Sequence, residues 1–363
     1  MKKWIRLMAW LAVILVVMLC LNPVFMPKWT QDIASTLVHN GFYDEEEDSL
    51  DVMYFGSSQV ACSISPMRIY EKTGIKSYSC ATGSQSIVCS YYWMKEAVKY
   101  QKPKVVVFDT LMAVEESILD DGANRNALDY MHFSSNKMQA ILAVDQVYDF
   151  DSTPASYMLP ILRYHDRWKE LSKEDVSYIF SDKHFVRKGY CPQSGIYVRP
   201  GGTYQGISVD LEVPEREITD YQREYLQKII DFCEEEEIAL VLIKTPMVAY
   251  TQESYNVIEK IARENQVPYI DMNITDIWQA AGMDYQTDFQ GAQHLNINGA
   301  DKVSDYLGEF LLENYPALAE QVEKAPTSAQ WEEDLKEYQD LVRPIREEME
   351  AQITAGSQSA SSP

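Results

Sequence analysis

Short apolar runs alternate with amphipathic stretches along much of this chain. Runs that suit buried parallel strands occur near residues 52–55, 77–81, 104–109, 238–243 and 267–271. Segments with apolar residues at helical spacing lie between and after them, near residues 66–71, 91–100, 221–235, 255–265 and 299–312. This alternation predicts an α/β fold built on a doubly wound parallel sheet.

The alternation is lost between residues 111 and 217. We expect this segment to be an insertion of helices and loops that covers the sheet edge and shapes a substrate pocket. Within it, His165 and Arg167 lie close to Trp168 and offer a cation and an aromatic face to a sugar or phosphate. The alternative interpretation is ordinary packing, with Arg167 paired to an acidic side chain.

The N-terminus carries a membrane signal over residues 1–27. Lys2, Lys3 and Arg6 precede an apolar run from Leu7 onward, and about twenty apolar residues suffice to span a bilayer. The positive flank predicts a cytoplasmic N-terminus, with the rest of the chain outside. A cleaved signal peptide is the alternative. No small-x-small cleavage site follows the run, so an uncleaved single-pass anchor in the cell membrane is favoured.

The remaining organisation follows from shifts in composition. Residues 28–47 are predicted to be a linker, 48–315 the α/β domain, and 316–363 an acidic C-terminal appendage. In the appendage, Trp331, Tyr338 and Val342 belong to one apolar helical stripe that Pro344 is expected to interrupt. From Ala355 onward, Gly, Ser, Gln and Pro predict a disordered tail.

The charge of the chain excludes one class of function, nucleic-acid binding. The chain has 363 residues, 46% of them apolar, and a formal net charge of −23. Nucleic-acid binding is excluded because phosphate contacts require clustered Lys and Arg.

Five cysteines follow Cys20 of the apolar run; this odd number and their apolar neighbours predict buried, reduced thiols. No metal-ligand spacing and no cofactor motif is present, so neither a metal nor a cofactor is expected.

The first predicted strand runs into a tight turn, Gly56-Ser57-Ser58. Gly56 permits a sharp reversal, which would place the two hydroxyls at the carboxyl edge of the sheet, where open α/β folds bind ligands. Ser58 is therefore a candidate nucleophile. The simpler interpretation is that one of the serines caps a helix.

A second stretch, residues 288–300, places His294 just before the last predicted helix. Together the two stretches resemble the SGNH/GDSL hydrolases, in which the nucleophilic serine follows the first strand and the catalytic histidine precedes the last helix. Ser58 and His294 fall on those positions. The resemblance covers roughly residues 48–312 and is greatest to the membrane-anchored bacterial branch related to the teichoic acid D-alanyl transfer protein and alginate O-acetylation proteins. It implies a flavodoxin-like three-layer sandwich.

The resemblance also implies further site residues. The backbone N–H groups of Ser58 and Gly83 would form the oxyanion hole, although Asp109-Thr110 stands where the family carries a third donor block. The family's catalytic acid lies three residues before the histidine, where this chain has Gly291. Asp288 is the nearest carboxylate; a Ser58–His294 dyad aided by a backbone carbonyl and a remote acid are the alternatives.

The implied function is that of an extracytoplasmic serine esterase or O-acyltransferase. Its substrates would be acetyl or D-alanyl esters of a cell-envelope polysaccharide or a teichoic-acid-like polymer, and a membrane-bound acyltransferase is a candidate partner. The alternative is a non-catalytic accessory protein that keeps the fold. The missing third block and Gly291 motivate this second hypothesis.

Overall fold

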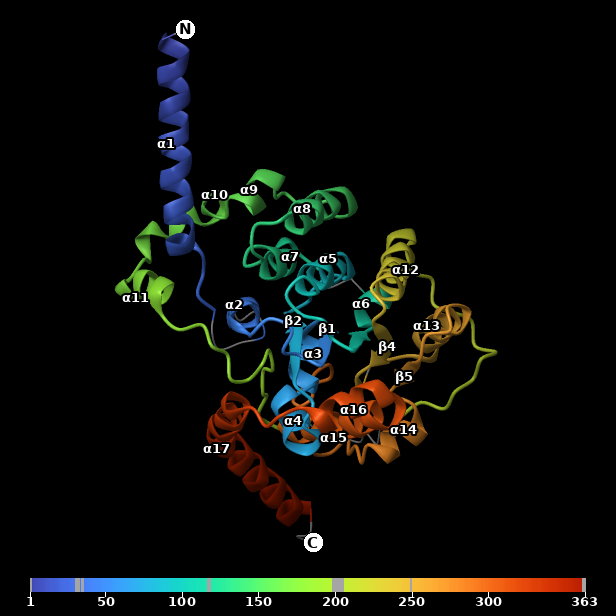
Figure 1. Ribbon diagram of the computed structural model, residues 1–363. Helices are drawn as coiled ribbons and strands as arrows, with labels where there is room; N and C mark the ends of the chain where they lie inside the picture. The colour runs from blue at the N-terminus through green and yellow to red at the C-terminus, as the bar shows by residue number, and fades with distance from the viewer. Residues whose placement is uncertain are drawn as a thin grey trace.

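The structure is a computed structural model of the chain, and it describes residues 2–29, 33, 36–115, 119–197, 206–248 and 250–360. Helices surround a central sheet, and the long helix α1 (Lys2–Phe25) projects from one end of this body (Figure 1). The C-terminal helix α17 (Ala329–Ala360) lies at the opposite end.

The sheet has five strands, all parallel, in the order β2-β1-β3-β4-β5. They are β1 (Val52–Gly56), β2 (Ser77–Ala81), β3 (Val105–Asp109), β4 (Ala239–Lys244) and β5 (Tyr269–Asp271). The chain pairs β1 first with β2 and then with β3 on its other side, so the order reverses at β1. The predicted α/β fold with a parallel sheet is confirmed, and the reversal places the end of β1 where such sheets bind ligands.

Helices cover both faces of the sheet because successive strand residues point to opposite sides. In β1, Met53 and Phe55 join one buried cluster, while Val52 and Tyr54 join the other. The first cluster includes α2 (Leu37–Asp44), α5 (Ile87–Ala97), α12 (Asp220–Glu235) and α13 (Gln252–Glu264). The second includes α3 (Ser58–Ser63), α14 (Thr275–Ala280), α15 (Ile297–Asn314) and α16 (Pro316–Lys324). Helix α4 (Pro66–Thr73) contributes to both, and so does α15, whose Ile297 and Ala300 belong to the first cluster.

Helix α1 is long and apolar enough to cross a membrane, and none of its residues is fully buried. Among the described residues, only those at the C-terminal end of α1 make contacts with the body. There the Asn22 side chain accepts a hydrogen bond of 2.8 Å from the backbone of Ile161, and the Tyr130 hydroxyl donates to the carbonyl of Pro27 at 3.0 Å. The apolar N-terminal helix is therefore held by the body where it ends.

The insertion between β3 and β4 is mostly helical. It contains α6 (Leu111–Val114), α7 (Asp121–Leu128), α8 (Ser135–Val147), α9 (Pro154–Met158), α10 (Ile161–Tyr164), η1 (His165–Lys169), α11 (Lys173–Ser177) and η2 (Tyr178–Phe180). Helices α7 and α8 pack on α5, while α10, η1 and α11 approach α1. Helices α7 to α10 of the insertion thus lie between the sheet layer and the N-terminal helix (Figure 1).

The C-terminal segment packs against the domain and is not a loose appendage. Trp331, Tyr338, Val342 and Met349 are all buried in the first cluster, and α17 continues through Pro344 to Ala360. The Tyr338 hydroxyl lies 2.8 Å from Ser65 Oγ. The expected interruption at Pro344 is wrong, because the docked apolar stripe holds the helix on both sides of the proline.

Ion pairs add to this docking of α17. Lys188 Nζ lies 2.8 Å from the Asp334 carboxylate and 2.7 Å from that of Glu45, and all three side chains are buried. His184 Nε2 contacts the other Asp334 oxygen at 2.7 Å. Burial alone would raise the pKa of Asp334, but its bonds to His184 and Lys188 outweigh burial and lower it to about 2. The carboxylate is therefore ionised at neutral pH and ties α17 to the domain.

The predicted linker is also part of the packed body. Val38 and Phe42 of α2 are buried, and Val38 O accepts a 2.9 Å hydrogen bond from the Tyr78 hydroxyl. Residues 30–32, 34 and 35 of the predicted linker lie outside the described part of the chain. The five cysteines after α1 are free, and the prediction that they are buried is confirmed.

Candidate active site

The turn after β1 exposes Ser58 at the start of a helix. Gly56 has a φ of +154°, and a Cβ at this position would lie 2.6 Å from a Val60 methyl group, so the close turn requires glycine. Ser57 is the N-cap of α3, and its hydroxyl accepts from the backbone of Gln59. Ser58 is the first helical residue, so its N–H has no partner within the helix. The cap and the candidate nucleophile are therefore different serines.

His294 lies on a narrow hairpin just before α15. The backbone N–H of Gln290 donates to His294 O at 3.0 Å, and the N–H of Asn296 donates to Asp288 O at 3.0 Å. Phe289 and Leu295 pair across the hairpin and are fully buried. Buried apolar side chains thus fix the base of the hairpin and leave His294 near its tip.

The two predicted residues meet. His294 Nε2 lies 2.9 Å from Ser58 Oγ, and both side chains are only partly buried. Burial, and secondly the charge of Lys244, lower the pKa of His294 below its ordinary value of 6.5. The imidazole is therefore neutral at pH 7 and can accept the serine proton.

A buried polar network beneath this pair was not anticipated from the sequence. Lys244, at the end of β4, is completely buried, and its Nζ donates to Thr245 O at 2.8 Å and to Gln59 Oε1 at 3.3 Å. The Asp109 carboxylate lies 3.8 Å from this ammonium and accepts from the backbone and hydroxyl of Thr245. Lys244-Thr245 follows a clear apolar strand, which was the signal available for a polar residue at the carboxyl edge.

Gln59 links this network to the histidine hairpin. Its Oε1 accepts from Lys244 and Thr245, and its Nε2 donates to the carbonyl of Gln293, next to His294. The backbone of Val248, in the loop after β4, donates to the carbonyl of Ala292 at 3.2 Å. The hairpin tip is thus held by α3 and by the loop after β4 together, which fixes His294 opposite Ser58.

The carboxylate of Asp288 is engaged at the base of the hairpin. It accepts from Lys302 Nζ at 2.7 Å, from the backbone of Asp284 at 2.6 Å and from the Thr287 hydroxyl at 2.9 Å. The described residues give it no hydrogen bond to the His294 imidazole. Gly291, at the family's usual acid position, has open space where a side chain would begin. The Asp288 carboxylate therefore stabilises the base of the hairpin through these contacts.

The backbone N–H of Gly83, the other expected oxyanion donor, has a partner. It donates to the carbonyl of Ile33 at 3.1 Å. Gly83 follows β2, and Gly56 and Ala81 are paired in register, so the two turns are neighbours at the sheet edge. A substrate oxygen could use this donor only after the Ile33 carbonyl has moved.

His165 and Arg167 lie beside α1. The Arg167 guanidinium donates to the carbonyls of Phe25 and Met26 at 2.6 and 2.7 Å and to Asp175 at 2.9 Å. His165 is exposed and contacts the carbonyl of Leu162. Arg167 is therefore paired with an acid and with backbone, as in the packing interpretation.

Within the described part of the chain, no group of three or more His, Cys, Asp or Glu side chains is placed to hold a metal ion. Comparison with protein-family models and with curated proteins finds no match to this chain. The chemistry of the site is therefore argued from the geometry around Ser58 and His294.

Proposed function

We propose that this protein is an extracytoplasmic serine esterase or O-acyltransferase of the SGNH/GDSL type. The observation that carries the proposal is the 2.9 Å contact between Ser58 Oγ and His294 Nε2 at the carboxyl edge of the parallel sheet. The strand order 2-1-3-4-5 supports it, because this is the flavodoxin-like order, with ligands at the β1/β3 switch point.

The geometry suits acyl transfer. Neutral His294 would accept the Ser58 proton as Oγ attacks an ester carbonyl carbon, and the same proton would then pass to the departing alkoxide. The N–H of Ser58, free of helical partners, would stabilise the oxyanion, joined by Gly83 once Ile33 has moved. Water or a sugar hydroxyl would then attack the acyl-enzyme and release Ser58.

The substrate class follows from the resemblance and from the proposed location outside the membrane. We propose acetyl or D-alanyl esters on a cell-envelope polysaccharide or teichoic-acid-like polymer, with a membrane-bound acyltransferase as partner. Because the chain carries a net charge of −23, contact with a polyanion would have to be local or bridged by cations.

Reaction with a fluorophosphonate probe tests the proposal. Labelling should occur on the wild-type protein and disappear in Ser58→Ala, because only an activated serine reacts. Ser57→Ala is the matched control, since it removes the neighbouring hydroxyl and one helix cap but leaves the nucleophile. A labelled protein can then be given an acetyl ester with and without a polyol acceptor, which separates transferase from hydrolase.

Two observations favour a second candidate, a non-catalytic accessory protein of an envelope-polymer modification assembly. The Gly83 N–H is occupied by Ile33 O, and the Asp288 carboxylate is bound by Lys302, not by His294. Absence of fluorophosphonate labelling in a folded, membrane-inserted wild-type protein would support this candidate. Labelling lost in Ser58→Ala would reject it.

A further inference from the structure

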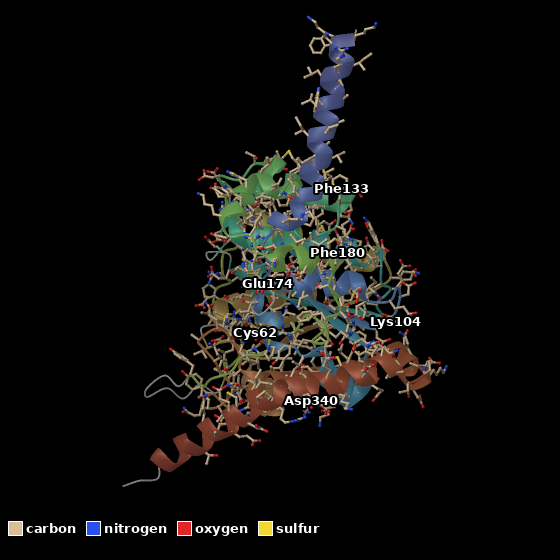
Figure 2. The ribbon with its side chains drawn as sticks, turned by 90° about the vertical axis from the view of Figure 1, so that its left-hand side faces the viewer. Cys62, Lys104, Phe133, Glu174, Phe180 and Asp340 are labelled. Carbon is tan, nitrogen blue, oxygen red and sulfur yellow. The ribbon has the colours of Figure 1, made fainter. Side chains whose placement is uncertain are left out.

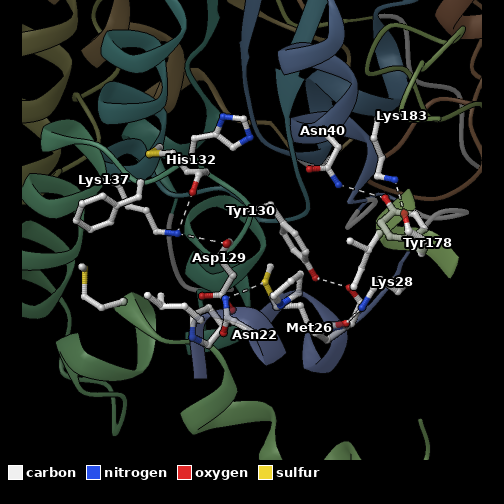
Figure 3. Close-up of a pocket in the computed structure, with 18 residues that line it drawn as sticks. Asn22, Met26, Lys28, Asn40, Asp129, Tyr130, His132, Lys137, Tyr178 and Lys183 are labelled. Carbon is white, nitrogen blue, oxygen red and sulfur yellow. Dashed lines mark hydrogen bonds between the residues drawn. The ribbon is translucent and has the colours of Figure 1, made fainter. Parts of the chain in front are cut away.

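A cavity of about 400 Å³ lies beside the C-terminal end of α1 (Figure 3). Its walls come from α1, from the segment around Asp129–Phe133 and from η2. None of the residues that line it belongs to the Ser58–His294 site. It is therefore a separate feature of the molecule.

One face of α1 forms a wall of this cavity. Leu19, Asn22, Pro23 and Met26 line it, and their i, i+3, i+4, i+7 spacing is that of a single helical face. The cavity therefore follows the last two turns of α1. If α1 crosses a bilayer, this length of cavity lies at the depth where acyl chains meet headgroups.

The opposite wall is apolar, and its surroundings are unusually exposed. Met131, Phe133, Met158, Pro160 and Ile179 line the cavity on this side. Phe133 is 74% exposed, and nearby Phe180 is 83% exposed; Figure 2 shows both near the base of α1. Exposed Phe side chains beside the end of a membrane helix are suited to enter the boundary between headgroups and acyl chains.

Three lysine side chains line the polar end of the cavity. Lys28, Lys137 and Lys183 line it together with one carboxylate, Asp129, although the whole chain has a net charge of −23. Asp129 already binds Arg125 and Tyr164. The lining is thus locally basic in an acidic protein.

Two of these lysines flank one ring. Lys183 Nζ lies 4.2 Å and Lys28 Nζ 5.9 Å from the centre of the Tyr178 ring. Partial burial lowers the pKa of Lys28 to about 8, against the opposing effect of Asp175. A bound anion would stabilise the charged form of this ammonium.

We propose that this cavity binds a membrane phospholipid with an anionic headgroup. The acyl chain lies along the stripe of α1 and against Met131 and Met158, and the phosphate lies at Lys28 and Lys183. The inference rests on the proposed membrane placement of α1 and is independent of the chemistry at Ser58.

Photo-crosslinking in nanodiscs tests the site. The full-length chain is reconstituted in phosphatidylcholine that contains a minor fraction of phosphatidylglycerol with a diazirine on one acyl chain; a phosphatidylcholine probe with the same diazirine is used in parallel. After irradiation, mass spectrometry should map adducts to the peptides of Met131, Met158 and Ile179. Because a lysine near an anionic headgroup is worth about fivefold in affinity, the phosphatidylglycerol probe should give at least about fivefold more adduct on them.

Three variants make the test specific. The double variant Lys28→Gln/Lys183→Gln should remove the preference for phosphatidylglycerol. The control is Lys169→Gln/Lys173→Gln, which changes two exposed lysines of the same region that do not line the cavity and should keep the preference. Met158→Trp should fill the cavity and reduce adducts of both probes on Met131 and Ile179.

Equal adduct yields for the two probes, or adducts confined to the outer face of α1, would overturn the proposal. Ser58→Ala should bind lipid like the wild type, so failure of the active-site assignment would leave these results unchanged. Loss of all adducts, including those on α1, would instead show that α1 does not enter the bilayer.

Discussion

Ser58 and His294 are distant in the sequence, yet their reactive atoms are in contact. The protonation state of His294 decides what this contact can do. Burial and the nearby Lys244 ammonium both disfavour the imidazolium, so the pKa of His294 is lowered below 6.5 and the ring is neutral at pH 7. A neutral ring can accept a proton, which is the property that a general base requires.

A pH profile of kcat/KM should reveal this effect. Because the pKa of His294 in the folded protein is lowered, the acid limb should have its midpoint below pH 6.5. Lys244→Met removes the second cause and should shift the limb to higher pH. Lys260→Met, which removes a charge at an exposed position, should not shift it. An unchanged limb in Lys244→Met would mean that the buried amine does not act on His294.

The contacts of Asp288 predict a mild phenotype for Asp288→Asn. Replacing a true triad acid by Asn costs about 10⁴-fold in kcat. Here the carboxylate binds Lys302 and the loop backbone, so we expect a loss within about tenfold, together with lower thermal stability. His294→Ala should lose about 10³-fold or more. A loss of about 10⁴-fold in Asp288→Asn would show that the carboxylate reaches the imidazole during turnover.

At the scale of elements, the hairpin of His294 is positioned by its contact with α15. A Cβ at Gly299, in the first turn of α15, would lie 2.4 Å from the carbonyl oxygen of Asp288. The hairpin and the helix can approach this closely only because position 299 is glycine. The location of His294 therefore depends on a residue outside the hairpin.

Gly299→Ala should consequently displace the hairpin. We expect a loss of about 1–3 kcal/mol in the free energy of unfolding and a fall in activity of about 100-fold, because a shift of about 1 Å at a catalytic group has that effect. Gly291→Ala is the matched control on the hairpin, since its Cβ would meet open space. Thermal melting and esterase assays of both variants give the comparison, and equal behaviour would contradict the explanation.

Helix α17 is the second element whose role is set by packing. Its side chains Trp331, Tyr338, Val342 and Met349 are buried, and each such side chain contributes about 1.5–3 kcal/mol. Truncation after residue 325 should therefore lower the melting temperature strongly or prevent folding. Truncation after Ala355 removes none of these four residues and should leave the melting temperature unchanged. Equal stability of the two forms would show that α17 docks without stabilising the domain.

At the scale of the whole molecule, α1 projects from the body, and the described contacts between them lie at the C-terminal end of α1. A helix of this length and composition can span a bilayer, and the exposed Phe133 and Phe180 lie close to its base. The proposed arrangement has the body resting on the outer membrane surface, with the sheet edge that carries Ser58 accessible to envelope polymers.

This arrangement predicts an attached, exported body. Lys2, Lys3 and Arg6 precede the apolar run, so the N-terminus should remain in the cytoplasm. Protease added to intact, wall-stripped cells should digest the body, and the chain should stay with the membrane after carbonate washing. A soluble, processed form in the medium would contradict this topology. Deletion of residues 2–25 should abolish membrane retention and serves as the control.

The sequence alone determined the strands of the sheet and the two candidate catalytic residues. The apolar runs at residues 52–55, 104–109 and 238–243 are strands of a parallel sheet, because buried strands require continuous apolar sequence. Ser58 and His294 were predicted because each stands in a local motif beside an element boundary. Short-range patterns carried this information.

Tertiary structure decided which partners these residues have. The position of Lys244 near His294, the carbonyl of Ile33 on Gly83 and the pairing of Asp288 with Lys302 all depend on how separate segments pack. The docking of α17 also depends on tertiary packing, because an amphipathic stripe does not specify the surface that buries it. Local pattern fixes periodicity and turns, whereas contacts between distant segments, and the ionisation states that they impose, exist only in the folded chain.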